Sequence, residues 1–218
     1  MKHIEAIILD FDGLILDTET PAYEAWRDIY RAHGRDLPMS QWAVCVGRGM
    51  VFDPHAHLER LLGQGLDRDE IQTQRRAEVK QRIDRQPLLP GVQEIFDQAG
   101  EMRLKIGVAS SSPRAWVEGH LKARGLFNRL QALRTAEDVQ ETKPDPELYV
   151  STLSALQVQA PHAIAFEDSP NGVLAAHRAG VYCVVVPNAI TCQLPFDSVP
   201  IDLQVDSLLE VNLRNLCA

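Results

Sequence analysis

Short apolar runs alternate with longer stretches of helical periodicity along most of this chain. The apolar runs fall at residues 6–9, 105–112, 130–134, 163–168 and 181–186, with a shorter one at 203–205. Continuous apolar runs of this length are typical of strands that are buried on both faces, as in a parallel sheet. Between them, apolar residues at helical spacing predict helices that end near residues 100, 125, 156 and 180, and a last helix from Ser207. This alternation predicts the α/β class, with a doubly wound, Rossmann-like parallel sheet and helices on both faces.

Residues 17–85 interrupt the alternation, because they carry helical patterns and no pattern typical of a strand. The first pattern contains Tyr23 and Trp26, the second begins near Ser40 and runs through Val46, and two more cover 51–62 and 67–85. Pro87 and other turn residues mark the return to the alternating pattern. We therefore predict an α/β core of residues 1–16 and 86–218 with an inserted all-helical cap of residues 17–85.

Charge and composition narrow the classes of partner. The chain has 218 residues, a net charge of −8 and a hydrophobic content of 45%, which are values typical of a globular protein. An acidic chain is a poor candidate for binding the phosphates of a nucleic acid, and the basic residues of 67–85 are interleaved with acidic ones. No apolar run approaches the roughly 18 residues that a membrane span needs. We expect no nucleic-acid partner and no membrane partner.

The cysteines indicate a reducing compartment. Four are present, and no two of them form a CxxC pair or a zinc-site spacing with histidine. The N-terminal apolar run is too short for the hydrophobic region of a signal peptide. The sequence therefore predicts a cytoplasmic protein.

Polar residues that could take part in catalysis or bind a ligand lie where the predicted strands end. They are Asp10 and Asp12 with Gly13, Ser110, Lys143, and the pair Glu167 and Asp168. The carboxyl ends of parallel strands form one edge of a sheet, so we expect these groups to converge there. Each also has an ordinary interpretation: a surface turn for the DxD-Gly run, helix caps for the serines and the acidic pair, and a solvated lysine in the KPDP turn.

The order and the residues of these segments resemble the four motifs of the haloacid dehalogenase superfamily. The segments are DFDG, a serine at a strand end, the lysine of KPDP and the acidic pair of EDS. The resemblance is greatest to the group of β-phosphoglucomutases and sugar-phosphate phosphatases that carry a small helical cap. It implies a Mg²⁺-dependent phosphatase that acts on a small phosphorylated metabolite, such as a sugar phosphate, through an aspartyl-phosphate intermediate.

The resemblance also implies roles for single residues. Asp10 is the nucleophile, Asp12 is the general acid and base, and Ser110 and Lys143 contact the transferred phosphoryl group. The implied metal ligands are the side chains of Asp10 and Asp168 and the backbone carbonyl of Asp12. Glu167 is implied to bind the metal directly or to orient its ligands.

Three further residues are candidates for binding substrate: Ser111, Arg48 and Asn171. For Arg48, a surface arginine is the alternative. With Ser169 and Gly172, Asn171 is also implied to brace the metal loop, for which a helix cap is the alternative.

Two other functions share the same core residues. A phosphoglucomutase of this group carries a histidine twelve residues after the nucleophile, whereas that position here is Ala22, which favours hydrolysis. A binding module without turnover would not require both aspartates and the lysine. Oligomeric state is expected to be a monomer or a weak dimer.

Overall fold

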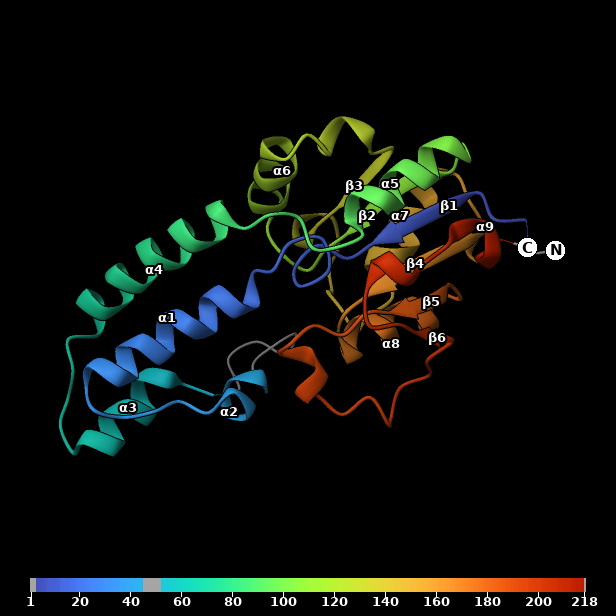
Figure 1. Cartoon of the computed structure of the whole chain (residues 1–218). Coiled ribbons are helices and arrows are strands. Elements are labelled where there is room, and N and C mark those ends of the chain that lie inside the picture. The colour runs from blue at the N-terminus through green and yellow to red at the C-terminus, as the bar shows by residue number, and fades with distance from the viewer. Residues whose placement is uncertain (1–2, 45–51, 218) are drawn as a thin grey trace.

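A six-stranded parallel sheet forms the centre of the protein (Figure 1). The computed structural model describes residues 3–44 and 52–217. The strands are β1 (Ala6–Leu9), β2 (Lys105–Ala109), β3 (Ala132–Arg134), β4 (Ala163–Glu167), β5 (Tyr182–Val185) and β6 (Leu203–Gln204), in the order β3-β2-β1-β4-β5-β6. All the pairings are parallel. The strand β1 therefore lies in the interior, between β2 and β4.

Helices cover both faces of this sheet, and the side chains of β1 alternate between them. Ile7 and Leu9 belong to the apolar cluster that includes residues of α5 (Val92–Glu101), α6 (Arg114–Ala123) and α9 (Leu213–Leu216). Ala6 and Ile8 belong to a second cluster with α7 (Glu147–Leu156) and α8 (Pro170–Arg178). The sequence of a strand that is buried on both faces is a continuous apolar run. The predicted doubly wound α/β fold is confirmed.

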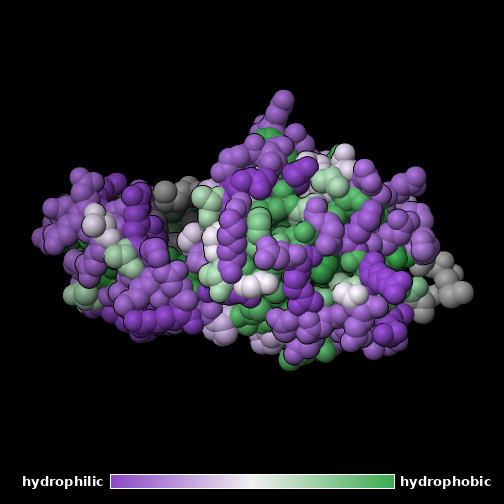
Figure 2. Space-filling model, turned by 90° about the horizontal axis from the view of Figure 1, so that it is seen from above, coloured by the Kyte–Doolittle hydropathy of each residue, from purple (hydrophilic) through white to green (hydrophobic). Residues whose placement is uncertain are grey.

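Helices joined by loops, with no strand among the described residues, make up the segment from α1 to α4, which lies beside the sheet (Figure 1) and forms a smaller lobe of the molecule (Figure 2). Its helices are α1 (Glu19–Ala32), α2 (Met39–Ala43), α3 (Pro54–Leu62) and α4 (Arg68–Arg85). They enclose a third apolar cluster around Tyr30 and Trp26. That residues 17–85 form a separate domain stays a prediction.

The chain leaves and re-enters the core at adjacent points. Leu16 and Leu88 form an isolated antiparallel bridge, and the Leu89 N–H donates to the Ile15 carbonyl at 3.0 Å. The two crossings between the lobes therefore lie side by side.

Several element boundaries differ from the prediction. The strand expected over 105–112 ends at Ala109. The Ser110 N–H still donates to the Arg134 carbonyl, but the chain then turns, and the Ser112 N–H and hydroxyl donate to Ser110 Oγ and Asp12 Oδ2. The helix expected from Ser40 through Val46 ends at Ala43 within the described residues. The last helix does not start at Ser207, whose hydroxyl instead caps a short 3₁₀ turn. None of the described helices combines the length and the apolar character needed to cross a membrane.

Candidate active site

The strand ends of β1 and β4 open into a cavity of about 320 Å³. Asp10 directly follows β1, and its backbone N–H donates to the Phe166 carbonyl at 3.0 Å. After Asp12 the chain turns at Gly13, which has a φ of 86°. A Cβ there would lie 2.3 Å from Asp168 Oδ2, so this turn requires glycine for its backbone and for its close contact. The residues that line the cavity are Asp10, Asp12, Glu19, Ser111, Ser112, Thr142, Lys143, Asp168, Ser169 and Asn171.

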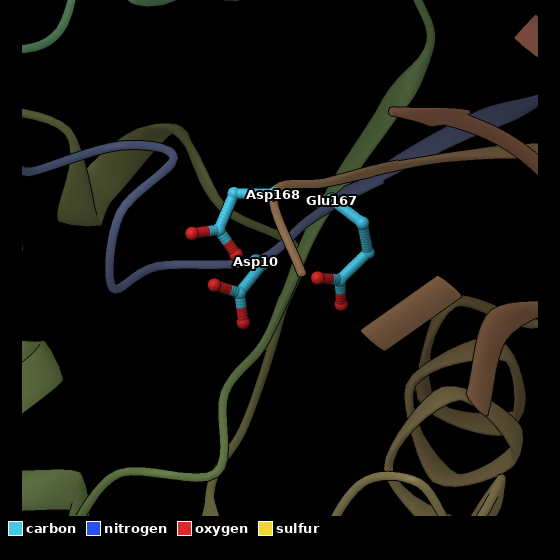
Figure 3. A group of neighbouring side chains, drawn as sticks. All are labelled: Asp10, Glu167 and Asp168. Carbon is cyan, nitrogen blue, oxygen red and sulfur yellow. The ribbon is translucent and has the colours of Figure 1, made fainter. Parts of the chain in front are cut away.

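Three buried carboxylates gather at this edge: those of Asp10, Glu167 and Asp168 (Figure 3). Each offers an oxygen within 4.8 Å of an oxygen of the others. Burial raises the pKa of Asp10 to about 7, with Glu167 adding to the shift and Lys143 opposing it. Burial and the charge of Asp10 raise the pKa of Asp168 well above its usual range. The protein alone therefore leaves negative charge at this edge that is only partly compensated.

Lys143 supplies the positive charge within the cluster. Its ammonium donates to Asp10 Oδ1, to Glu167 Oε1 at 2.6 Å and to the Ala109 carbonyl at 2.7 Å. Burial favours the neutral amine, but the two carboxylates outweigh this effect and raise the pKa of Lys143. Tyr149 also donates its hydroxyl to Glu167 Oε1. Glu167 therefore holds the lysine that contacts Asp10.

The acidic cluster fits a hard divalent cation. Glu167 Oε2 is buried and has no hydrogen-bond partner among the described residues, so this oxygen remains available as an acceptor. Carboxylate oxygens are the ligands that Mg²⁺ prefers. The side chains of Asp10, Glu167 and Asp168 are those that could hold it. The side chain of Asp12 is not in this cluster, and a contribution through its backbone carbonyl stays a prediction.

Asp12 instead faces the loop between β2 and α6. Ser112 donates to Asp12 Oδ2 at 2.6 Å, and Ser110 donates to the same oxygen at 3.3 Å. The indole N–H of Trp116 donates to Asp12 Oδ1 at 3.0 Å. Sequence analysis missed Ser112 and Trp116 as partners of Asp12. The serine run at a strand end was a usable signal for Ser112, whereas Trp116 resembles any apolar residue on the inner face of a helix.

Asn188 was also missed. Its Nδ2 donates to Asp168 Oδ2 at 2.7 Å and to the Gly13 carbonyl at 3.1 Å. Its Oδ1 accepts the backbone N–H groups of Ile190 and Thr191 at 2.9 Å, which fixes the amide orientation. Asn188 follows β5, so the argument from strand ends could have found it.

The expected substrate-binding residues divide into two groups. Ser111 and Asn171 line the cavity, whereas Arg48 lies outside the described residues. Glu19, at the start of α1, lines the same cavity and was not predicted. Burial raises the pKa of Glu19 to about 7, and the charges of Asp12 and Asp17 add to the shift.

Chemically, the cavity combines a buried carboxylate next to an ammonium, a cluster suited to a cation, and a second carboxylate held by separate donors. A carboxylate stabilised in this way can act as a nucleophile toward an electrophile of high negative charge. The second carboxylate is free of the cluster and is suited to proton transfer.

The chain is similar to known proteins in sequence and in fold. A family model described as "Haloacid dehalogenase-like hydrolase" matches residues 7–186. The "Putative phosphatase YhcW" of Bacillus subtilis is 44% identical over 213 residues, which cover 98% of this chain and 96% of that protein. "Hexitol phosphatase B" of Escherichia coli is 30% identical and covers 99% of this chain and 97% of its own length. A crystal structure of a "putative beta-phosphoglucomutase" from Thermotoga maritima is 25% identical, with a TM-score of 0.76 over 93% of this chain and 94% of that one.

Proposed function

Because the chain belongs to the haloacid dehalogenase-like hydrolase family, we propose that it is a Mg²⁺-dependent phosphatase that hydrolyses a phosphate monoester of a small metabolite, in particular a sugar or polyol phosphate. The observation that carries the proposal is the convergence of Asp10, Lys143 and the acidic pair at one edge of the sheet. The names of relatives support the substrate class, since one is a hexitol phosphatase.

In the proposed first step, a carboxylate oxygen of Asp10 attacks phosphorus, and the bond between phosphorus and the ester oxygen breaks. Lys143 faces the attacking carboxylate, so its charge reduces repulsion between that group and the phosphate. Asp12 gives its proton to the leaving oxygen, which departs as an alcohol.

The second step regenerates the nucleophile. Asp12, now ionised, takes a proton from water as the water oxygen bonds to phosphorus and the bond to Asp10 breaks. Inorganic phosphate leaves, and both aspartates return to their first state. The donors on Asp12 hold it apart from the acidic cluster, which supports a role in proton transfer for this residue.

Mg²⁺, bound by Asp10, Asp168 and Glu167, would neutralise the charge that accumulates on the transferred phosphoryl group. The spare acceptor on Glu167 and the raised pKa of Asp10 support a cation at this place, because both indicate negative charge that the described residues do not fully compensate.

Hydrolysis is proposed in preference to phosphoryl transfer within a sugar. Ala22 stands at the position where the mutases of this group carry a histidine, and alanine cannot transfer a proton. A mutase would interconvert hexose phosphates with little net release of phosphate.

The proposal extends to setting and assembly. Cys183, Cys192 and Cys217 are free thiols, which supports a reducing compartment such as the cytoplasm. We propose a monomer or a weak dimer that works on small molecules and has no nucleic-acid partner.

The test is release of inorganic phosphate from a panel of sugar, polyol and nucleotide monophosphates, measured with Mg²⁺ and with EDTA. We expect turnover of at least one sugar or polyol phosphate that EDTA abolishes and added Mg²⁺ restores. Asp10→Asn should remove the activity. Activity that survives either change, or conversion of a hexose phosphate without release of phosphate, would contradict the proposal.

A further inference from the structure

One face of α6 connects the site to the end of the helical cap. Trp116, His120 and Arg124 follow one another at intervals of four residues, so they lie along one side of that helix. The figure of the whole chain shows α6 beside the end of α4 that returns to the core (Figure 1). We propose that Trp116 is a positioning residue for the Asp12 carboxylate, and that His120 and Arg124 tie its position to the last turn of α4. This inference rests on the proposed function, because it assigns how the acid of that reaction is oriented.

The first contact in this series fixes the carboxylate of Asp12. Trp116 Nε1 donates to Oδ1 at 3.0 Å, and Ser112 Oγ donates to Oδ2 at 2.6 Å. Donors on both oxygens define the plane of the carboxylate, whereas Ser112 and Ser110, which both donate to Oδ2, would leave Oδ1 without a donor. The indole N–H is a donor only, so this contact cannot reverse its direction.

The second contact holds the indole. The rings of Trp116 and His120 meet edge to face, with centroids 4.3 Å apart, and the imidazole also stacks on Phe11, with centroids 6.2 Å apart. Phe11 lies between Asp10 and Asp12 in the chain. The buried imidazole therefore contacts both the indole and the segment that carries both aspartates.

The third contact reaches the cap. Arg124 Nη1 lies 3.1 Å from His120 Nδ1. A guanidinium has no acceptor, so the imidazole nitrogen accepts this hydrogen bond. Arg124 Nη2 donates to the carbonyls of Ile83 and Gln86, both at 2.9 Å. These carbonyls lie at the C-terminal end of α4, where a cation is favoured by the helix dipole, and the Ile83 carbonyl also accepts the backbone N–H of Gln86 at 3.0 Å.

Hydrogen bonds and ring contacts therefore connect the last turn of α4 continuously to the carboxylate of Asp12. A shift of the last turn of α4 acts on Arg124, and through His120 on the indole that donates to Asp12. The side chains of this path include neither Lys143 nor the acidic cluster of Asp10, Glu167 and Asp168. Its loss should therefore affect proton transfer by Asp12 and leave the attack by Asp10 in place.

Turnover of p-nitrophenyl phosphate separates the two steps. Its leaving group needs no proton, so formation of the aspartyl-phosphate does not depend on Asp12, whereas release of phosphate does. In Trp116→Phe we expect the burst of p-nitrophenolate to keep its rate while the steady-state rate falls roughly tenfold, the size of effect expected for a hydrogen bond to a charged group. Arg124→Met should reproduce this pattern with a smaller, several-fold decrease.

Lys122→Met is the matched control on the outer face of α6, where Lys122 pairs with Glu118 at 2.6 Å, and it should change neither phase. General damage to the fold would lower both phases together. Equal decreases in both phases of Trp116→Phe, or no decrease in either, would overturn the role of Trp116. A wild-type steady-state rate in Arg124→Met would overturn the tie to α4.

A measurement without substrate keeps this inference separate from the proposed function. The indole N–H resonance of Trp116 should move when Asp12→Ala removes its acceptor, and in the same direction, by less, in Arg124→Met. The indole resonances of Trp26 and Trp42, which lie in the cap cluster, should stay in place. An unmoved Trp116 resonance overturns the inference whether or not the protein releases phosphate, and absence of phosphate release from the wild type contradicts only the proposed function.

Discussion

Gly172, in the first turn of α8, lies directly against the carboxylate of Glu167 at the end of β4. A Cβ at this glycine would lie 1.9 Å from Glu167 Oε2, a distance that no side chain can occupy. Glu167 is fully buried and holds Lys143 at 2.6 Å. The absence of a side chain at Gly172 is therefore a condition for placing the ammonium beside Asp10.

Gly172→Ala should impair both stability and activity. The added methyl group must displace the Glu167 carboxylate or the first turn of α8, and overpacking of this kind costs about 1–3 kcal/mol of unfolding free energy. Urea unfolding and phosphate release would measure the two effects. Gly119→Ala is the control, since a Cβ in that exposed part of α6 meets nothing within 4 Å. It should stabilise the protein by about 0.5–1 kcal/mol and leave activity unchanged.

Lys143→Met should remove most of the activity and destabilise the metal-free protein. Without the ammonium, the carboxylates of Asp10 and Glu167 lie together in a buried place with no opposite charge. Removing one partner of a buried ion pair costs about 3–5 kcal/mol, and loss of one charge-stabilising donor lowers turnover by about 10²–10³-fold.

Lys80→Met breaks a comparable pair at the surface, with Asp84 at 2.5 Å. Because that pair is exposed, the free energy of unfolding should change by less than about 1 kcal/mol. Similar losses in the two variants would contradict the buried role assigned to Lys143.

Asn188→Ala should weaken Mg²⁺ binding by about 10–100-fold, the range typical of residues that orient metal ligands. The substitution removes the amide that holds Asp168 Oδ2 at 2.7 Å. Thermal shift against Mg²⁺ concentration gives the affinity without turnover. Asn212→Ala, which removes the cap of α9, should lower the melting temperature and leave the Mg²⁺ affinity as it is in the wild type.

Glu19→Gln should change how stability depends on pH in the presence of EDTA. The fold raises the pKa of Glu19 to about 7 from a usual 4.5, so the folded state favours the protonated form. The stability that this group contributes is complete below about pH 4.5 and is lost as pH rises through about 7. Glutamine stays neutral, so the variant should keep that stability at pH 8.

Urea unfolding at pH 5 and pH 8 would test this expectation. Glu19 is partly open to the cavity, so the advantage of the variant should grow by on the order of 1 kcal/mol between the two pH values. Glu94→Gln, on the exposed side of α5, controls for the loss of a negative charge. An advantage of Glu19→Gln that shrinks with rising pH would contradict the assignment.

Some parts of the site followed from the local sequence. The run at residues 6–9 has no polar position, which is the pattern of a strand buried on both faces, and Asp10 ends it. The same reasoning placed Ser110 and the pair Glu167 and Asp168 at strand ends. Parallel strands share one edge for such ends, so their convergence could be predicted from the alternation of strands and helices. The roles of these residues in a reaction stay predictions.

The sequence by itself determined the α/β class, because the periods of strands and helices are set by local geometry, and it determined that acids, a serine and a lysine meet at one edge. Only the tertiary structure decided which of them touch. Asn188 on Asp168 and Trp116 on Asp12 join different elements that are 20 and 104 residues apart in the chain, and Gly172 meets Glu167 across the turn between β4 and α8. Such contacts depend on strand order and on how each helix is rotated against the sheet, and neither is written in the period of any one segment.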